Sequence, residues 1–247
     1  MKRLNSTMLV ALPKIAIILV EPQMGENIGA VARAMKNFTL SDLRLVSPRD
    51  GWPNIKAESM SVGAINLIHS AKIYKSIQDA ISDLEYVYAA SATPRDMNKN
   101  YILSRDIHGD ITNIESLGIM FGRENCGLNN KEIAYANKII TIDTDSSFSS
   151  LNIAHSVAVI CYELFQGKKN ARADLQNIQT LATKSEIEYF YQHLFAELDK
   201  RDFFKIADKK EVMSIKIRNL FSKIENLSHS EIQMLRGIVS VLSDKKG

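Results

Sequence analysis

The chain has 247 residues, 45% of them hydrophobic, so it can bury one sizeable core together with an appendage. Its net charge of +3 excludes a strongly basic composition of the kind that announces a nucleic-acid partner. The two cysteines, Cys126 and Cys161, lack the spacing of a zinc site or a disulfide framework, and we expect no metal. No apolar run has the length of a membrane span, so we expect a cytoplasmic protein with no membrane partner.

Short β-rich runs alternate with helical patterns along the first two thirds of the chain. We expect strands over residues 15–20, 43–46, 73–74, 86–91, 117–122 and 138–143. We expect helices over residues 27–37, 55–69, 77–84, 131–136 and 151–165. This alternation predicts an α/β fold in which helices cover both faces of a mainly parallel sheet.

The β-rich pattern disappears after a predicted helix end and linker at residues 166–170. Three amphipathic helices are predicted beyond it, over residues 185–198, 210–224 and 228–242. Ser185 with Glu188, and Ser228 with Glu231, have the spacing of capping boxes at the start of the first and third of these helices. We therefore divide the chain into an α/β domain, residues 1–166, and a C-terminal helical extension, residues 167–247.

The charge is unevenly distributed between these two parts. Residues 1–166 hold 16 Lys and Arg against 17 Asp and Glu, whereas residues 167–247 hold 15 against 11, a net charge of +4. This excess fits either an ordinary solvated helical surface or a weak RNA-facing patch, and composition alone favours the solvated surface.

Three segments follow predicted strands and lead into predicted helices or loops: residues 21–29, 121–128 and 148–155. Open α/β sheets bind their ligands at such turns. The first segment lacks the GxGxxG spacing of a dinucleotide site. The second has the glycine spacing of a phosphate loop, but Leu128 and Asn129 replace the required Lys-Ser/Thr, so a phosphate-loop NTPase is excluded.

Several polar residues of these segments have both a structural and a functional interpretation. The small and apolar neighbours of Arg33 predict a packed setting, where the guanidinium needs a carboxylate or a substrate phosphate, and spacing alone favours the structural salt bridge. The Glu124 carboxylate either holds a nearby backbone segment or Arg33 in place, or is simply a solvated acid of the loop. Ser150 and Asn152 are satisfactory helix caps without any further role.

The three segments resemble the three motifs of the SpoU branch of the SPOUT methyltransferases. Motif one corresponds to residues 27–33, motif two to residues 121–124 and motif three to residues 149–152. The extension, through the segments 212–213, 218–221 and 235–238, resembles that of the bacterial tRNA 2′-O-methyltransferases acting at nucleotide 32. The resemblance covers nearly the whole chain.

The resemblance implies an α/β fold with a deep trefoil knot, whose loops hold S-adenosylmethionine largely through backbone groups. By position, the cofactor-binding residues are Ala90, Ser91, Ala92, Gly122, Ile142, Ser149, Ser150 and Leu151. The implied reaction is methylation of a ribose 2′-hydroxyl in tRNA, and the implied assembly is a homodimer. We expect no DNA partner.

The resemblance also assigns roles to the residues that spacing left open. The implied catalytic residues are Arg33, Ser150, Asn152, Asn27 and Glu124. Arg33 of one subunit would reach the other's site, clamp the adjacent phosphate and stabilise a developing alkoxide, while Asn27 and Glu124 would fix Arg33 and the loops. Ser150 and Asn152 would orient the hydroxyl and the cofactor, and Arg95 would contact tRNA.

Two rival functions are weighed against this interpretation. One is the same reaction on another tRNA or ribosomal RNA nucleotide, and the C-terminal extension is the feature that argues for nucleotide 32. The other is a catalytically silent RNA-binding dimer, against which the intact motif residues argue.

Overall fold

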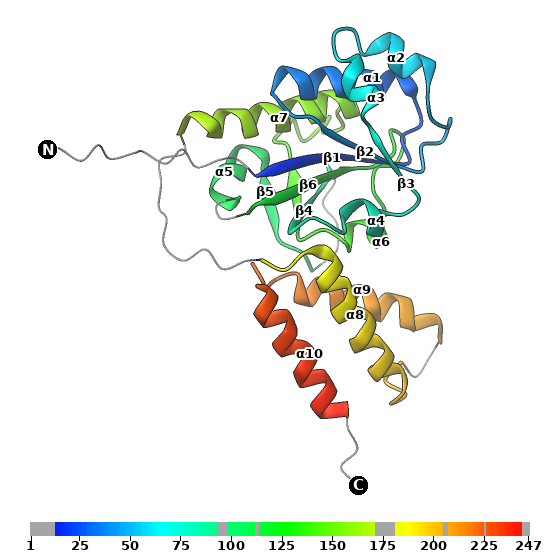
Figure 1. Ribbon diagram of the computed structural model, residues 1–247, viewed down its shortest axis with the longest axis vertical. Helices are drawn as coiled ribbons and strands as arrows, with labels where there is room; N and C mark the ends of the chain where they lie inside the picture. Colours follow the sequence, from blue (N-terminus) through cyan, green and yellow to red (C-terminus); the bar gives the residue numbers. More distant parts are fainter. Residues whose placement is uncertain are drawn as a thin grey trace, which may run out of the picture.

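A parallel β-sheet forms the centre of the structure (Figure 1). The computed structural model describes residues 13–92, 98–111, 114–170, 181–204, 207–224 and 226–243. Within these residues seven strands form one sheet, in the order β3-β2-β1-β6-β4-β7-β5, and every pair is parallel. The strands are β1 (Lys14–Val20), β2 (Asp42–Val46), β3 (Lys72–Tyr74), β4 (Tyr86–Ala90), β5 (Tyr101–Leu103), β6 (Ser116–Phe121) and β7 (Lys138–Thr141). The α/β architecture predicted from the alternating pattern is confirmed.

Helices cover both faces of this sheet (Figure 1). They are α1 (Gly25–Asn37), α2 (Ile55–Met60), α3 (Ile65–His69), α4 (Ile77–Ile81), η1 (Ser104–Asp106), α5 (Ile107–Asp110), α6 (Asn130–Ile133) and α7 (Ile153–Asn170). In β1, Ile17 packs in the cluster beneath α1 and α7, whereas its neighbour Ile18 packs in the cluster beneath α4 and α6. Because both faces are covered, the strand reads as a continuous apolar run rather than an alternating one.

The strand order places the functional loops next to one another. β4 lies between β6 and β7, although both of these strands come later in the chain. Carboxyl ends of parallel strands lie at one edge of the sheet, so the loops that follow Ala90, Phe121 and Thr141 emerge side by side. This order is consistent with the implied trefoil knot, and the knot itself stays a prediction.

Two predicted helices differ from the observed ones. The helix predicted over residues 55–69 is two helices, because Gly63 has a positive φ of 77° that interrupts the pattern between α2 and α3. The helix end predicted at residues 166–170 is wrong, since α7 continues to Asn170. A glycine such as Gly167 costs a helix only about 1 kcal/mol relative to alanine, which packing of the remaining turns offsets. The short β5 and the two short helices before β6 had no predicted counterpart.

Three helices follow the sheet, and together they form a bundle beside α4 and α6 (Figure 1). They are α8 (Lys184–Asp199), α9 (Ala207–Phe221) and α10 (His229–Ser243), and the three amphipathic helices predicted from the sequence are thus confirmed. Phe190, Tyr191 and Ile232 form the buried centre of the bundle. Backbone N–H groups at the start of α8 donate to carbonyls of the segment that follows α4, from Lys184 to Leu84 over 2.6 Å and from Ser185 to Ser82 over 3.1 Å. None of the described helices has the length and apolarity to cross a membrane.

The cap of α8 differs from the predicted one. Thr183, not Ser185, caps the helix: its hydroxyl accepts a hydrogen bond from the Glu186 N–H, and the Glu186 carboxylate accepts one from the Thr183 N–H. Glu188 instead forms an ion pair with Arg218. The predicted pair of Ser228 and Glu231 at the start of α10 is confirmed.

This cap is open to a direct test. Thr183→Ala removes the side-chain acceptor and is expected to lower the free energy of unfolding by about 1 kcal/mol. Ser185→Ala, two residues along the same helix, removes no capping bond and is the matched control. Urea denaturation of the two variants measures the difference, and equal midpoints would contradict the assignment of the cap.

Candidate active site

A cavity of about 450 Å³ lies at the sheet edge where the loops after β4, β6 and β7 meet. Its lining includes every residue that the sequence assigned to the cofactor, together with four of the five residues assigned to catalysis. These lining residues are Asn27, Ala90, Ser91, Ala92, Gly122, Glu124, Ile142, Ser149, Ser150, Leu151 and Asn152. The fold therefore brings all three sequence motifs to one place, although Asn27 of motif one lies 97 residues before Glu124 of motif two and 125 before Asn152 of motif three.

Glu124 joins motif two to the start of α1. Its carboxylate accepts hydrogen bonds from the backbone N–H of Gln23 at 2.9 Å, from the N–H of Met24 at 3.2 Å and from the Asn27 amide at 2.9 Å. Met24 occupies the N-cap position of α1 and its side chain makes no cap bond. The carboxylate from a distant loop therefore satisfies N–H groups at this helix start, where negative charge is favourable.

Asn152 joins motif three to the same point. Its side-chain oxygen accepts from the Ala154 N–H at 2.8 Å, which caps α7, and its amide donates to the side-chain oxygen of Asn27 at 3.1 Å. Asn27 therefore lies between Asn152 and Glu124, with one hydrogen bond to each. The helix-cap interpretation of Asn152 is correct, and the same side chain also ties two motifs together.

The loop after β6 folds back onto Gly122. Gly127, with a positive φ of 66°, pairs with Arg123, and its N–H donates to the Arg123 carbonyl at 2.8 Å. A Cβ atom on Gly122 would lie 2.1 Å from the Gly127 carbonyl carbon, so only glycine fits there.

Arg123 was not among the predicted site residues, yet it anchors this loop. Its guanidinium forms ion pairs of 2.8 Å with Glu132 and with Glu21. Hydrogen bonding to Glu132 raises the pKa of Arg123 above its ordinary value, and Glu21 adds to the effect. Its position between Gly122 and Glu124 is a signal that could have identified it.

Arg33 stands apart from this network. The packed setting expected for it is wrong: Arg33 is exposed on α1, and it neither lines the cavity nor forms an ion pair within the described part of the chain. Arg33 lies on the solvent side of α1, whereas its neighbours Val31, Ala32 and Ala34 are buried. The small residues therefore pack against the core without enclosing the guanidinium. Arg95 lies outside the described residues.

The Glu124 network gives a testable contribution to stability. Glu124→Gln replaces two acceptor oxygens by one acceptor and one donor, so the bonds to three N–H donors cannot all be kept. We expect the free energy of unfolding to fall by about 1–2 kcal/mol. Glu26→Gln, which removes a half-buried carboxylate of the same helix start that pairs with Lys56 but lies outside the Glu124 network, is the control and is expected to change it less. Denaturant titration of both variants measures the two effects.

Comparison with protein-family models supplies the identification. The model of the SpoU rRNA methylase family matches residues 14–162, which include all three motifs. The chain belongs to the SpoU methylase family. A second model, the C-terminal domain of the tRNA methyltransferase TrmJ, matches residues 185–246 of this SpoU methylase.

Curated relatives of this SpoU methylase share most of its length. The tRNA (cytidine-2′-O-)-methyltransferase TrmJ of Methanocaldococcus jannaschii is 32% identical over 85% of this chain and 91% of its own. The tRNA (cytidine/uridine/adenosine-2′-O-)-methyltransferase TrmJ of Pseudomonas aeruginosa is 30% identical over 93% of both chains. Among solved structures, TrmJ from Z. mobilis ZM4 has a TM-score of 0.85 and 36% identity, over 95% of this chain and 100% of its own.

A more distant structure agrees in fold. The SpoU methyltransferase AviRb of Streptomyces viridochromogenes, solved in complex with the cofactor AdoMet, has a TM-score of 0.51 at 16% identity. Among the residues that the present structure describes, no group of His, Cys, Asp and Glu side chains is arranged to hold a metal ion.

Proposed function

We propose that the protein transfers a methyl group from S-adenosylmethionine to a ribose 2′-hydroxyl of tRNA. The observation that carries the proposal is the meeting of the three family motifs in one cavity, joined through Asn27, Glu124 and Asn152. The curated relatives named above, which are tRNA 2′-O-methyltransferases, support the same reaction.

The cavity fits the proposed cofactor in size and in chemistry. Its volume of about 450 Å³ lies within the roughly 300–1,000 Å³ of small-molecule sites. Small side chains at Ala90, Ser91 and Ala92 leave the backbone of that loop accessible, and Gly122 packs against the backbone of Gly127. When bound, S-adenosylmethionine supplies an electrophilic methyl group on a sulfonium, so the protein's main task is to hold the ribose hydroxyl in line with it.

The hydrogen bonds already present suggest how the residues share this task. Asn27, Glu124 and Asn152 use their polar atoms on one another and on helix starts, which makes them positioning residues for the loops. Ser150 lines the cavity beside them, and we assign to its hydroxyl a contact with the cofactor or the ribose.

We propose that a homodimer completes the site. Arg33 is exposed and away from its own cavity, so an activating role requires that it act on the cavity of a partner. Exposed apolar side chains near α1 and α7 give such a partner a surface: Met24 is 46% exposed, Tyr162 47% and Phe148 78%. In the dimer, the Arg33 guanidinium clamps a phosphate next to the target nucleotide and stabilises the developing alkoxide.

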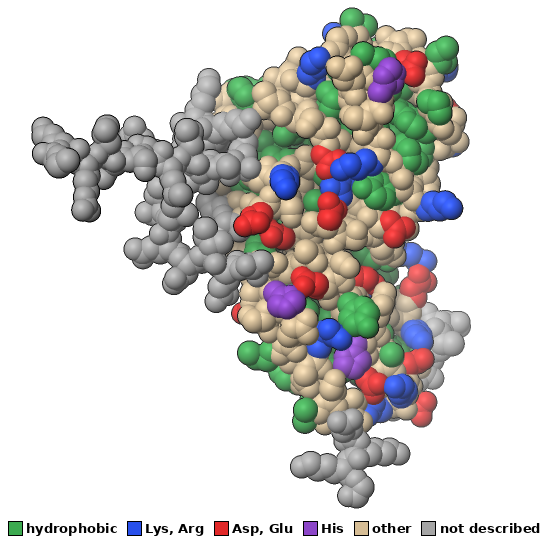
Figure 2. Space-filling view, in the orientation of Figure 1, with side chains coloured by type: hydrophobic (Ala, Val, Ile, Leu, Met, Phe, Trp, Pro, Cys, Tyr) green, Lys and Arg blue, Asp and Glu red, His purple; other side chains and the backbone are tan. Residues whose placement is uncertain are grey.

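We propose nucleotide 32 of the anticodon loop as the target, with the reaction taking place in the cytoplasm. The match of the C-terminal helices to the TrmJ C-terminal domain supports a tRNA substrate. On the face drawn in Figure 2, basic and acidic side chains are interspersed, so the net charge of +4 after residue 166 forms no single basic patch there. Other tRNA or ribosomal RNA nucleotides remain the alternative targets.

A substrate lacking one hydroxyl tests the proposal. Purified protein with S-adenosylmethionine is expected to methylate an unmodified tRNA transcript, and a 2′-deoxy nucleotide at position 32 is expected to abolish the reaction. The same tRNA with a 2′-deoxy nucleotide at position 34 is the control. Continued methylation of the tRNA that carries a 2′-deoxy nucleotide at position 32 would overturn nucleotide 32 as the target. Absence of methylation on every RNA tested would support a silent RNA-binding dimer.

A further inference from the structure

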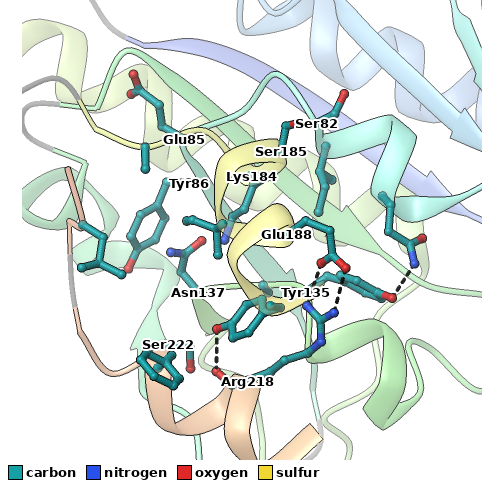
Figure 3. A pocket seen from close by; sticks show the side chains of 18 of the residues that line it. Ser82, Glu85, Tyr86, Tyr135, Asn137, Lys184, Ser185, Glu188, Arg218 and Ser222 are labelled. Atoms are coloured by element: carbon teal, nitrogen blue, oxygen red, sulfur yellow. Dashed lines mark hydrogen bonds and ion pairs between the residues drawn. The ribbon is translucent and has the colours of Figure 1, made fainter. Parts of the chain in front are cut away.

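Arg236 of α10 is held against the neighbouring helix α8. The central carbon of its guanidinium lies 4.6 Å from the centre of the Tyr189 ring, within the range of a cation–π contact. Its Nη1 atom donates to the side-chain oxygen of Gln233, one turn earlier in α10, at 3.3 Å. Tyr189 is 57% exposed, so this contact lies at the surface of the bundle. Arg236 lines neither the methyl-transfer cavity nor the cavity between bundle and sheet domain that Figure 3 shows.

One edge of this guanidinium, formed by Nε and Nη2, has no acceptor among the described residues. Nε is buried and makes no hydrogen bond. The bond that the group does make goes from Nη1 to Gln233. The N–H bonds of Nε and Nη2 point the same way, so together they form a fork that fits two oxygens of one oxyanion. Because a buried donor without an acceptor is costly, we expect a ligand on this edge.

The same edge holds a carboxylate in other arginines of this chain. Nε and Nη2 of Arg44 both donate to Asp42, at 3.1 and 2.7 Å. Nε and Nη2 of Arg49 both donate to Asp50, at 2.8 and 3.3 Å. The chemistry that satisfies this edge elsewhere in the molecule is therefore that of an oxyanion, and Arg236 has the same edge open.

The carboxylates of α8 and α10 cannot serve as that oxyanion, because each is bonded to another residue. Glu188, for example, accepts from both Nη atoms of Arg218, at 2.7 and 2.8 Å (Figure 3). The acids of the two helices with such bonds are Glu186, Glu188, Glu197, Asp199 and Glu231. The ligand of Arg236 must therefore come from outside these helices.

The surface beside the fork is open to a large partner. A Cβ atom added to Gly237, the next residue, would meet nothing within 4 Å. After Glu231, helix α10 carries no further acid up to its end at Ser243. A phosphate that approaches Arg236 along this part of α10 therefore meets no negative charge on the helix itself.

We infer that the Nε and Nη2 edge of Arg236 binds a backbone phosphate of tRNA, outside the methyl-transfer cavity. The inference rests on the proposed function, which supplies tRNA as the partner. Arginine pairs with phosphate through two parallel N–H···O bonds, and such contacts fix the position of a nucleic acid on a protein. A single prepared arginine also agrees with the interspersed charges of Figure 2, where no single basic patch is visible.

The salt dependence of tRNA binding tests this contact on the full-length protein. Each neutralised phosphate releases counterions, so the slope of log affinity against log salt falls by about one unit when one contact is removed. We expect Arg236→Gln to lower tRNA affinity by about tenfold or more and to remove that unit of slope. Fluorescence anisotropy of labelled tRNA, with S-adenosylhomocysteine present and at several potassium chloride concentrations, measures both quantities.

Two further variants make the result specific to the fork. Gln233→Glu leaves Arg236 in place but puts a carboxylate beside it, so it should give the same two losses even if Arg236→Gln does not fold. Arg201→Gln removes an arginine of the same bundle that Glu197 already neutralises, and is expected to keep the wild-type slope and affinity. All three variants change the net charge by −1, so an unspecific charge effect would move them alike. Equal slopes for all three would overturn the inference.

Inorganic phosphate distinguishes bound RNA from a free anion. We expect wild type and Gln233→Glu to differ in affinity for tRNA and to show the same weak response to inorganic phosphate in calorimetry, because a lone phosphate lacks the other contacts of the RNA. Phosphate binding by the wild type alone, together with equal tRNA affinities, would assign the fork to a free anion and overturn the RNA contact.

None of these measurements requires methyl transfer. Loss of the unit of slope in a protein that methylates no RNA would remove the proposed reaction and leave the Arg236 contact standing. Methylation of tRNA with unchanged slopes in Arg236→Gln and Gln233→Glu would do the opposite.

Discussion

Arg33→Ala is expected to reduce methyl transfer by about a hundredfold or more while leaving affinity for S-adenosylhomocysteine unchanged, because the guanidinium acts on the RNA rather than on the cofactor. Arg33 is exposed and does not line the cavity of its own chain, which is why cofactor binding should be insensitive. Turnover with tRNA and calorimetry with S-adenosylhomocysteine measure the two quantities separately. Arg33→Lys should restore little, since an ammonium lacks the planar fork of donors.

Lys36→Ala is the control for this prediction, because it removes another exposed cation from α1 and is expected to retain turnover. Mixed dimers test whether Arg33 acts across subunits. An Arg33→Ala chain combined with a Gly122→Val chain has one intact cavity that faces one intact arginine. Random mixing should then give about a quarter of wild-type activity. No recovery in the mixture, or full activity of Arg33→Ala alone, would contradict the proposed dimeric site.

Gly122→Val is expected to give the largest loss of cofactor binding. Even the first added carbon would lie 2.1 Å from the Gly127 carbonyl carbon and 2.2 Å from the Leu128 nitrogen, so the loop must move. Overpacking of about 1–3 kcal/mol concentrated on this loop corresponds to a loss of affinity of about fivefold to 150-fold. Calorimetry with S-adenosylhomocysteine measures it, after circular dichroism has shown that the variant is folded.

Gly109→Val is the matched control, because a side chain at Gly109 meets nothing within 4 Å. It is expected to bind S-adenosylhomocysteine with wild-type affinity. Retention of affinity by a folded Gly122→Val variant would remove this loop from the cofactor site.

The sheet and the lining of the main cavity were predictable from the sequence because both depend on local signals. Runs such as Ile15–Val20 are apolar on every position, and the polar residues that end these strands mark the functional edge. The division of the helix predicted over residues 55–69 was not predictable in the same way, because hydrophobic periodicity continues across Gly63. The sequence could not decide between Thr183 and Ser185 as the cap of α8, because each is followed by a glutamate three residues later. The choice depends on where the backbone enters the helix, which the residue types alone do not determine.

The contacts that build the site could not be predicted from the sequence, because they join residues that are far apart in the chain. Glu124 and Asn27 are 97 residues apart, and their pairing follows only from the strand order that brings the two loops together. The exposure of Arg33 depends on which face of α1 packs against the sheet. The sequence did not predict that face, because the residues on either side of Arg33 are both small and apolar. The docking of α8 against the segment that follows α4 likewise joins distant parts of the chain, and no sequence motif predicts that contact.

The position of β4 between β6 and β7 has a consequence for synthesis on the ribosome. Both hydrogen-bonding edges of β4 must wait for strands that are translated later, first β6 and then β7. Until residue 121 has left the exit tunnel the nascent chain carries an apolar strand without either neighbour, and one edge of β4 stays unpaired until residue 141 has followed. Such unpaired edges are prone to misassociation. Slow, largely post-translational completion of the sheet, and a benefit from chaperones during that interval, follow from the order of the strands alone.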